Sequence, residues 1–261
     1  MPWGQFPISS MTINSERGPA KSDSDTDTSL VLDPHIPVTS SALDEETARA
    51  EVYGLLAQLY YAPPADALLA ALQVAVTEAP AAGGFLEEPW RALVGVARES
   101  SAQDLRAEYD ALFGGVGKPD VYLFGSHYLS GFLNERPLAQ LRQALQALGL
   151  TRDEAMPETE DHVAYLCEVM RYLIAGEEPP VAGDSPLGGQ RSMGAVGSAG
   201  DEIAVANLTR QREFFTAHLQ PWAGAMCDAI AAHPRARFYA TLAAFTQAFL
   251  GVEQQGFDLL P

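Results

Sequence analysis

The amino-acid sequence predicts an all-α protein, a compact multi-helix bundle of about nine or ten helices. Three observations predict this class. After about residue 43, apolar residues recur at the spacing of three to four residues that is typical of helices. No segment alternates convincingly with period two, and no repeat of fixed length stands out. The composition, with 47% hydrophobic and 19% charged residues, is globular, and 261 residues can bury a core without disulfide or metal support.

The first 42 residues are expected to form a disordered tail. The stretch 22–29 is polar and has no large apolar residue, and Pro34 and Pro37 follow it. Such a segment cannot bury enough surface to offset its ordering entropy. A helical domain is therefore expected over residues 43–261.

Four helices are expected in the first half of this domain. The first begins at Asp44, a favoured N-cap residue, and ends before Pro63. The second covers about 65–78, and the third runs from Pro89 to about Ser100. The apolar stripes of the first and fourth helices consist of Val52, Leu55, Leu56, Leu59 and Tyr60, and of Leu105, Tyr109, Leu112 and Phe113.

The second half of the chain repeats this pattern. Helices are expected to end at Gly149 and at Gly176, and Pro221 breaks or restarts a later one. A Gly-rich insertion is expected over about residues 183–200. The apolar stripes consist of Leu138, Leu141, Leu145 and Leu148; of Val163, Leu166, Cys167, Met170, Leu173 and Ile174; of Leu208, Phe215, Leu219 and Trp222; and of Phe238, Leu242, Phe245 and Phe249.

The charge of the chain excludes several classes of partner. There are 34 acidic and 16 basic side chains, which give a net charge of −18. Nucleic acids and anionic membranes both favour a basic face, so neither is expected as a partner. The sequence has no run of about 18 apolar residues, no recognisable secretion signal and two cysteines, which indicates a cytoplasmic protein without stable membrane association. An acidic protein does attract basic peptides.

Motifs for catalysis, metals and cofactors are incomplete, so no catalytic residue, metal or cofactor is predicted. A phosphate-binding loop would need glycine in place of Leu112 and a hydroxyl group in place of Pro119. His162 and Cys167 are five residues apart and face different sides of a helix, which is unsuitable for a shared metal ion. The sequence also has no Gly-x-Ser-x-Gly nucleophile elbow.

One polar cluster, Pro157 to His162, opens the helix predicted after it. Its acidic residues suit the N-terminus of a helix, and Glu158 and His162 are four residues apart, so their side chains can meet on one face. Two interpretations remain open. The cluster is either a capped helix start with a histidine held by a carboxylate, or a carboxylate–imidazole pair at the mouth of a groove that accepts a cationic guest.

Three segments of the sequence, in this order, resemble one family. The first is Tyr109–Gly115, similar to Y-x-x-L-F-x-G, and the second is Pro119 followed by Ser126–Leu129, similar to a proline and S-x-Y. The third is Glu158–Ala164, similar to E-P-x-D-H-[IV]-A, although Thr159 replaces the usual proline. On these segments the chain resembles the TorD/DmsD-like redox-enzyme maturation chaperones over about residues 45–252.

This resemblance implies an all-helical cytoplasmic chaperone and not an enzyme. It implies that the protein binds the twin-arginine signal peptide and the apo form of a molybdoenzyme catalytic subunit, and supports molybdopterin insertion before Tat export. The resemblance also implies a peptide site. The residues that line or brace this site are Glu158, Asp161 and His162. The residues that shape its other wall are Tyr109, Phe113, Pro119, Ser126 and Tyr128.

Several alternatives stay open at this point. Each of the aromatic residues also suits plain core packing. A nucleotide-dependent enzyme, such as a GTP hydrolase, and a structural subunit of a helical complex are the alternative functions. Relatives can exchange halves, so a homodimer is a further expectation, with candidate hinges at about 114–125 and 150–158. The sequence does not identify the client enzyme.

Overall fold

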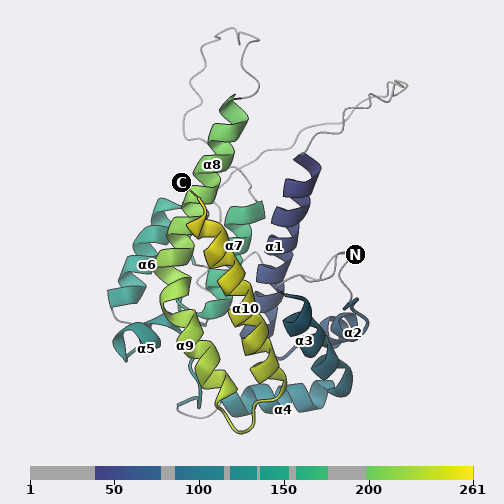
Figure 1. The fold of residues 1–261 in the computed structure, drawn as a ribbon. Helices are drawn as coiled ribbons and strands as arrows, with labels where there is room; N and C mark the ends of the chain where they lie inside the picture. The colour runs from purple at the N-terminus through teal and green to yellow at the C-terminus, as the bar shows by residue number, and fades with distance from the viewer. Residues whose placement is uncertain are drawn as a thin grey trace, which may run out of the picture.

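The computed structural model describes residues 39–77, 86–114, 118–133, 136–152, 157–175 and 198–260. Most of these residues are helical, and none belongs to a sheet, which confirms the predicted all-α bundle (Figure 1). Most of the expected tail and of the expected insertion at 183–200 lies outside the described residues. The helices are α1 Thr39–Tyr61, α2 Asp66–Gln73, α3 Glu87–Glu99, α4 Ala102–Leu112, α5 Gly125–Ser130, α6 Arg136–Ala147, α7 Val163–Ala175, α8 Ser198–Phe214, α9 Gln220–Ala231 and α10 Phe238–Asp258, with a π-helical turn, η2, at Phe215–Leu219.

The core of the bundle lies between the long helices. α1 packs along α7, and α10 packs against α9 and α3. In Figure 1, α2 and α3 lie on one side of these helices, and α5 and α6 lie on the opposite side. The predicted apolar stripes supply many of the buried side chains. Burying one face of each helix is the main source of helical stability in water. The largest fully buried side chains include Tyr53, Tyr60, Phe215, Phe238 and Tyr239.

Local sequence signals explain several helix ends. Ser101 and Asp104 form a capping box at the start of α4. Gly149 adopts a φ of 72°, which favours glycine, directly after α6. At the start of α10, the carboxylate of Glu108 accepts hydrogen bonds from the amides of Arg237, Phe238 and Tyr239 at 2.8–3.2 Å. This last cap comes from a distant helix, so no local pattern announces it.

The structure corrects several predicted boundaries. α1 begins at Thr39, so Asp44 lies inside this helix and is not its N-cap. α2 ends at Gln73, earlier than expected, because the chain then turns to place the Val76 carbonyl where the Trp90 indole N–H donates to it at 2.9 Å. α3 begins at Glu87, two residues before Pro89. The cluster before Val163 is a turn and not the first turn of a helix.

The region around Pro221 is one long helical passage with an irregularity. α8 leads into the π-helical turn η2, and α9 then starts at Gln220 with Pro221 in its first turn. Proline fits this position because the first amides of a helix have no partner within it. Of the two expectations for Pro221, restarting the helix is therefore correct.

A buried polar network joins α1, α8 and α10, and the sequence analysis did not foresee it. The Arg49 guanidinium donates to both carboxylate oxygens of Glu253 at 2.7 and 2.8 Å, and to the Gln211 side-chain oxygen at 3.1 Å. The Tyr53 hydroxyl also donates to Glu253, at 3.0 Å. Because each buried charge has several partners, the network fixes how these three helices meet.

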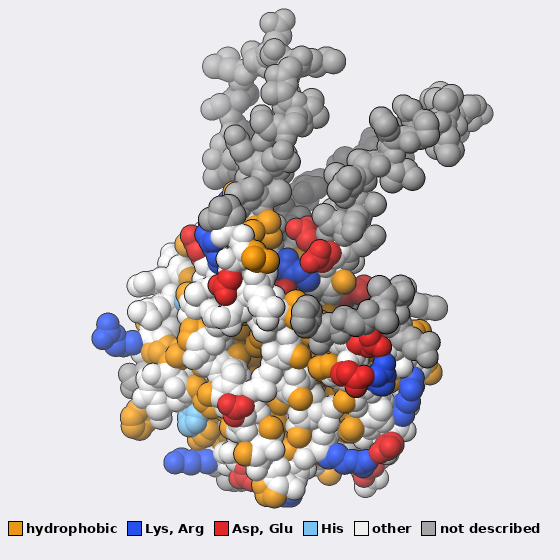
Figure 2. All heavy atoms as spheres, in the orientation of Figure 1, with side chains coloured by type: hydrophobic (Ala, Val, Ile, Leu, Met, Phe, Trp, Pro, Cys, Tyr) orange, Lys and Arg blue, Asp and Glu red, His pale blue; other side chains and the backbone are white. Residues whose placement is uncertain are grey.

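The surface of the described residues carries interspersed charges of both signs on the face shown in Figure 2. Among the described residues, Arg91 pairs with Glu87 and Glu88, and Arg237 pairs with Glu99. Within the described part of the chain, no helix has the length and hydropathy needed to cross a membrane.

Candidate functional site

Two segments that are distant in sequence meet in a short antiparallel bridge between Phe124 and His162. The Gly125 amide donates to the Asp161 carbonyl at 2.9 Å, and the Val163 amide donates to the Leu123 carbonyl at 2.8 Å. The bridge places the start of α5 beside the start of α7. It therefore brings the second and third resembling segments of the sequence into direct contact.

Asp161 is buried at this junction, with an exposed fraction of 3%. One of its carboxylate oxygens accepts hydrogen bonds from the Ser126 amide at 2.8 Å and from the Ser126 hydroxyl at 2.5 Å. The other oxygen accepts from the Thr159 hydroxyl at 2.7 Å. Thr159, which stands where the family pattern has proline, therefore gains a specific role as a donor. Asp161 holds the start of α5 and the 157–162 turn together.

His162 is also buried, with an exposed fraction of 4%, and is surrounded by aromatic rings. Its ring centroid lies 5.0 Å from that of Phe124, 5.8 Å from Tyr165 and 6.3 Å from Tyr61. Burial lowers the pKa of His162 to about 4, against a smaller opposing effect of the Asp161 charge. The Ala164 amide donates to its Nδ1 at 3.2 Å, which fits a neutral ring. His162 is therefore an uncharged part of the packing at neutral pH.

Glu158 and His162 do not form the side-chain pair that their spacing suggested. That pair requires helical geometry, but the backbone between them is a turn in which the His162 amide donates to the Thr159 carbonyl at 3.1 Å. Asp161, and not Glu158, is the carboxylate that acts on the His162 pKa. Glu158 is half-buried and lies close enough to Tyr109 and Tyr165 for its charge to raise the pKa of both hydroxyls.

Glu160, between these residues, has its charge balanced by arginines. Arg142 of α6 donates to its two carboxylate oxygens at 3.0 and 2.9 Å, and the Arg152 Nε lies 3.8 Å from one of them. Although partial burial opposes it, the hydrogen bond from Arg142 keeps the pKa of Glu160 below its usual value. These contacts attach α6 to the turn.

Tyr109 and Phe113 form one aromatic wall together with Tyr239 of α10. The ring centroids of Tyr109 and Phe113 are 5.1 Å apart, and those of Phe113 and Tyr239 are also 5.1 Å apart. The Tyr109 hydroxyl donates to the Tyr61 carbonyl at 2.8 Å. Both Tyr109 and Phe113 are half-buried, so one part of each side chain serves the core and another part reaches solvent.

Tyr128 belongs to a second aromatic group, on α5 and α9. Its ring stacks on Trp222 at a centroid distance of 5.8 Å, and its hydroxyl donates to the Tyr122 carbonyl at 2.8 Å. Gly125 has no space for a side chain, because a Cβ atom there would lie 2.9 Å from the Trp222 ring. The Trp222 indole N–H donates to the carbonyl of His218, in the π-helical turn, at 2.6 Å.

Pro119 is the one predicted site residue that the structure leaves apart from the others. It precedes Asp120, which pairs with His233 at 3.1 Å and with Arg235 at 3.4 Å in the connection between α9 and α10. Among the described residues, no hydrogen bond or ring contact joins Pro119 to the 157–162 turn. Of the other predicted residues, Ser126, Asp161 and His162 lie at the bridge, and Tyr109 is linked to His162 through Tyr61.

The sequence analysis missed several residues of this region. Tyr61 and Tyr165 face His162, although neither belonged to a predicted motif. Beside α5, Leu129, Phe132 and Leu133 form an exposed apolar patch, in which Phe132 is 71% exposed. The run of apolar residues after His127, outside any predicted helix stripe, was the signal that could have indicated this patch.

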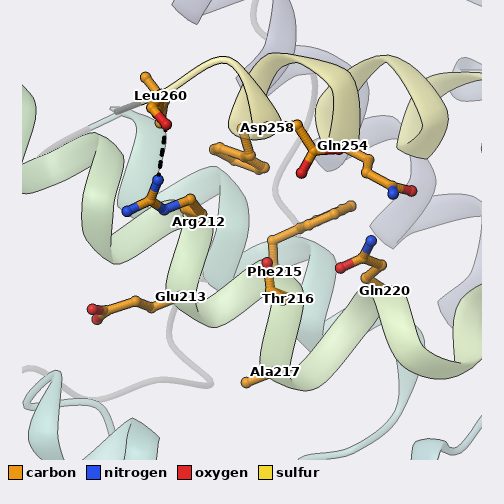
Figure 3. A pocket seen from close by; sticks show the side chains of 10 residues that line it. Arg212, Glu213, Phe215, Thr216, Ala217, Gln220, Gln254, Asp258 and Leu260 are labelled. Atoms are coloured by element: carbon orange, nitrogen blue, oxygen red, sulfur yellow. Dashed lines mark hydrogen bonds between the residues drawn. The ribbon is translucent and has the colours of Figure 1, made fainter.

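Two hollows lie near these residues in the described part of the chain. The larger one, a groove of about 620 Å³, lies between η2 and the end of α10, where Arg212 donates to the Leu260 carbonyl at 3.3 Å (Figure 3). Gln220 and Gln254 reach it from opposite helices. The smaller hollow, of about 30 Å³, includes Ser126 and Asp161 in its lining. That volume admits about one or two water molecules but no peptide side chain.

The two cysteine thiols are buried, which bears on their reactivity. Burial raises the pKa of both cysteine thiols, that of Cys227 to about 12, so neither is a thiolate nucleophile. No group of three or more histidine, cysteine or acidic side chains that could hold a metal ion occurs within the described ranges. What the region offers is a half-buried carboxylate, partly exposed aromatic rings and an apolar patch.

A comparison with protein families finds one match. A family model described as nitrate reductase delta subunit matches residues 81–228, which is more than half of the chain and includes all three resembling segments. Among curated proteins, no match is found.

Proposed function

Because the chain belongs to the nitrate reductase delta subunit family, whose members are molybdoenzyme maturation chaperones, we propose that it binds the twin-arginine signal peptide and the apo form of a molybdoenzyme catalytic subunit. This membership confirms the resemblance to the TorD/DmsD-like maturation chaperones. The family implies that the partner is the catalytic subunit of a nitrate reductase-type molybdoenzyme. The chaperone keeps this subunit in the cytoplasm until molybdopterin is inserted, and then releases it for export.

The observation that supports this proposal is that the second and third resembling segments meet at the bridge, and that Tyr109 of the first segment is linked to them through Tyr61. Glu158, Tyr109 and Phe113 are each half-buried, so they are available to a guest. Asp161, His162 and Ser126 are buried and act as positioning residues, because their polar groups are occupied within the protein. A signal peptide with a basic part and an apolar part suits an acidic protein with such half-buried side chains.

The apolar stretch of the signal peptide needs an apolar surface near the Glu158 carboxylate. The patch of Leu129, Phe132 and Leu133 meets that need better than the groove beside η2. Leu129 lines the same small hollow as Asp161, so the patch continues from the bridge. The groove is lined by acidic and amide side chains as well as by Phe215 and Phe257, which are themselves buried. We therefore place the apolar contact at the patch.

Titration calorimetry with a synthetic twin-arginine leader peptide of a nitrate reductase-type catalytic subunit tests the proposal. The wild-type chain is expected to bind the peptide, and Phe132→Ser is expected to weaken binding about tenfold, since burying such a ring contributes about 1.5–3 kcal/mol. Leu259→Ser is the matched control, because Leu259 is 86% exposed at the far end of α10. Absence of wild-type binding, together with no co-purification of a catalytic subunit from the native cell, would overturn the proposal.

A further inference from the structure

Three tyrosines and one carboxylate meet where four parts of the chain converge. Tyr61 is the last residue of α1, Tyr109 lies near the end of α4, Tyr165 lies in the first turn of α7, and Glu158 belongs to the turn before α7. The ring centroids of Tyr61 and Tyr165 are 6.1 Å apart. The Tyr109 hydroxyl, bonded to the Tyr61 carbonyl, ties the third ring to this pair. We refer to these four residues as the tyrosine–glutamate cluster.

Electrostatics shows that the members of the cluster are close neighbours. Burial raises the pKa of Tyr109, and the Glu158 charge and Tyr61 raise it further. Burial likewise raises the pKa of Tyr165, with additional contributions from Tyr61 and Glu158. Glu158 is therefore near enough to both hydroxyls for its charge to act on them.

Two polar groups of the cluster lack a hydrogen-bond partner within the described residues. Tyr165 is 5% exposed, and its hydroxyl has neither donor nor acceptor there. At Glu158, the recorded hydrogen bond uses the backbone oxygen, which accepts from the Arg152 guanidinium at 2.9 Å and leaves the carboxylate without a donor. Buried polar groups are normally satisfied, so the unsatisfied Tyr165 hydroxyl, near a half-buried carboxylate, indicates a place for an incoming donor.

The nearest cation of the protein itself does not fill this place. The Arg152 side chain is directed to the Glu158 backbone and towards Glu160, and Glu160 is also held by Arg142. The positive charges at the turn are thus matched by Glu160. Among the described residues, no hydrogen bond from an arginine to the Glu158 carboxylate is found.

We propose that the tyrosine–glutamate cluster binds the guanidinium group of one arginine of the signal peptide. This inference rests on the proposed function and specifies its cationic subsite. A guanidinium group is planar, stacks on tyrosine rings and donates two parallel hydrogen bonds to one carboxylate, so it matches the rings and Glu158 at once. The Tyr165 hydroxyl can accept a further hydrogen bond from it. A lysine ammonium group is compact and strongly hydrated, and satisfies fewer of these contacts.

The experiment compares two peptides on full-length protein by titration calorimetry. One is the twin-arginine leader peptide, and the other has both arginines replaced by lysine. Wild-type protein is expected to prefer the arginine peptide by about tenfold, because a stacked, bidentate contact is lost in the lysine peptide. Glu158→Gln is expected to weaken binding of the arginine peptide about tenfold, and Tyr165→Phe by a few-fold, and both variants should reduce the preference for arginine.

The matched control is Glu51→Gln, which makes the same substitution at an exposed position of α1. It is expected to leave both affinities unchanged within twofold, which separates local contact from the loss of one negative charge. If wild-type protein binds the leader but Glu158→Gln and Tyr165→Phe keep its affinity and its preference, the cluster is not the subsite and the proposed function stands. If wild-type protein does not bind the leader at all, the proposed function and this subsite both fall.

Discussion

Glu158 and Asp161 are three residues apart in one motif, yet they lie in opposite environments. Asp161 is buried and accepts three hydrogen bonds from Ser126 and Thr159, whereas Glu158 is half-buried and its carboxylate accepts none within the described residues. The first acid is occupied by the protein, and the second is available to a partner. The comparison teaches that one short motif can combine a residue that stabilises the fold, Asp161, with a residue that is available for binding, Glu158. It also separates the two experimentally, because the buried part should govern stability and the open part should govern affinity.

The largest effect on stability is expected for Asp161→Ala. The change leaves the buried Ser126 amide and two hydroxyls without their acceptor, which costs about 3–4 kcal/mol of unfolding free energy. For a chain of this size, that loss corresponds to a decrease in Tm of about 10 °C. Thermal denaturation followed by circular dichroism measures it. Asp161→Asn, which keeps an acceptor oxygen, should lose clearly less, and equal losses would contradict the assigned role of the hydrogen bonds.

A smaller effect is expected from acid, acting through His162. Its pKa is lowered to about 4 in the folded protein, whereas an unfolded chain has the ordinary value near 6.5. As the pH falls through this window, the unfolded chain takes up the proton first, so the free energy of unfolding decreases. Between pH 7 and pH 5 the loss should be about 2 kcal/mol.

Urea denaturation at both pH values, for wild-type protein and His162→Asn, measures this contribution. The asparagine variant removes the titrating group and keeps a polar atom for the Ala164 amide. It should be less stable at pH 7 but lose less stability on acidification. An identical pH dependence in both proteins would show that the ring of His162 does not carry this effect.

The smallest effect on stability is expected for a change of Glu158, the half-buried acid of the motif. Glu158→Gln should change the unfolding free energy by less than about 0.5 kcal/mol, because its carboxylate makes no hydrogen bond or ion pair among the described residues. The same urea titration at pH 7 measures it. A loss as large as that of the Asp161 variants would mean that both acids are structural, and would remove the distinction between the two parts of the motif.

The sequence contained much of the fold and part of the site. Helical periodicity predicted α1, α4, α6, α7 and α10, because the residues of their predicted stripes are largely buried, although α7 buries other faces as well. It could not predict α5, which is only six residues long and has its first turn held by Asp161, 35 residues further along the chain. The acidic residues of 158–162 also favoured a helix start there, since such a pattern does not register a backbone bridge to Leu123.

The same limit applies to the site. The motif indicated which short segments matter, but not which side of each residue faces the solvent. Tyr61 and Tyr165 join the region through contacts between α1 and α7, and these depend on tertiary packing. The Arg49–Glu253 pair spans 204 residues, so no local pattern could reveal it.

The bridge between Phe124 and His162 also brackets one segment of the chain. Between these two residues lie α5 and α6, and α6 packs chiefly on α5. The two ends of this segment are held together by the hydrogen bonds of the Gly125 and Val163 amides, and the ion pair of Arg142 with Glu160 attaches α6 to the turn. We expect the amide protons of α6 to exchange with solvent deuterium together with those of Gly125 and Val163, as a single opening unit, ahead of the paired helices α1 and α7.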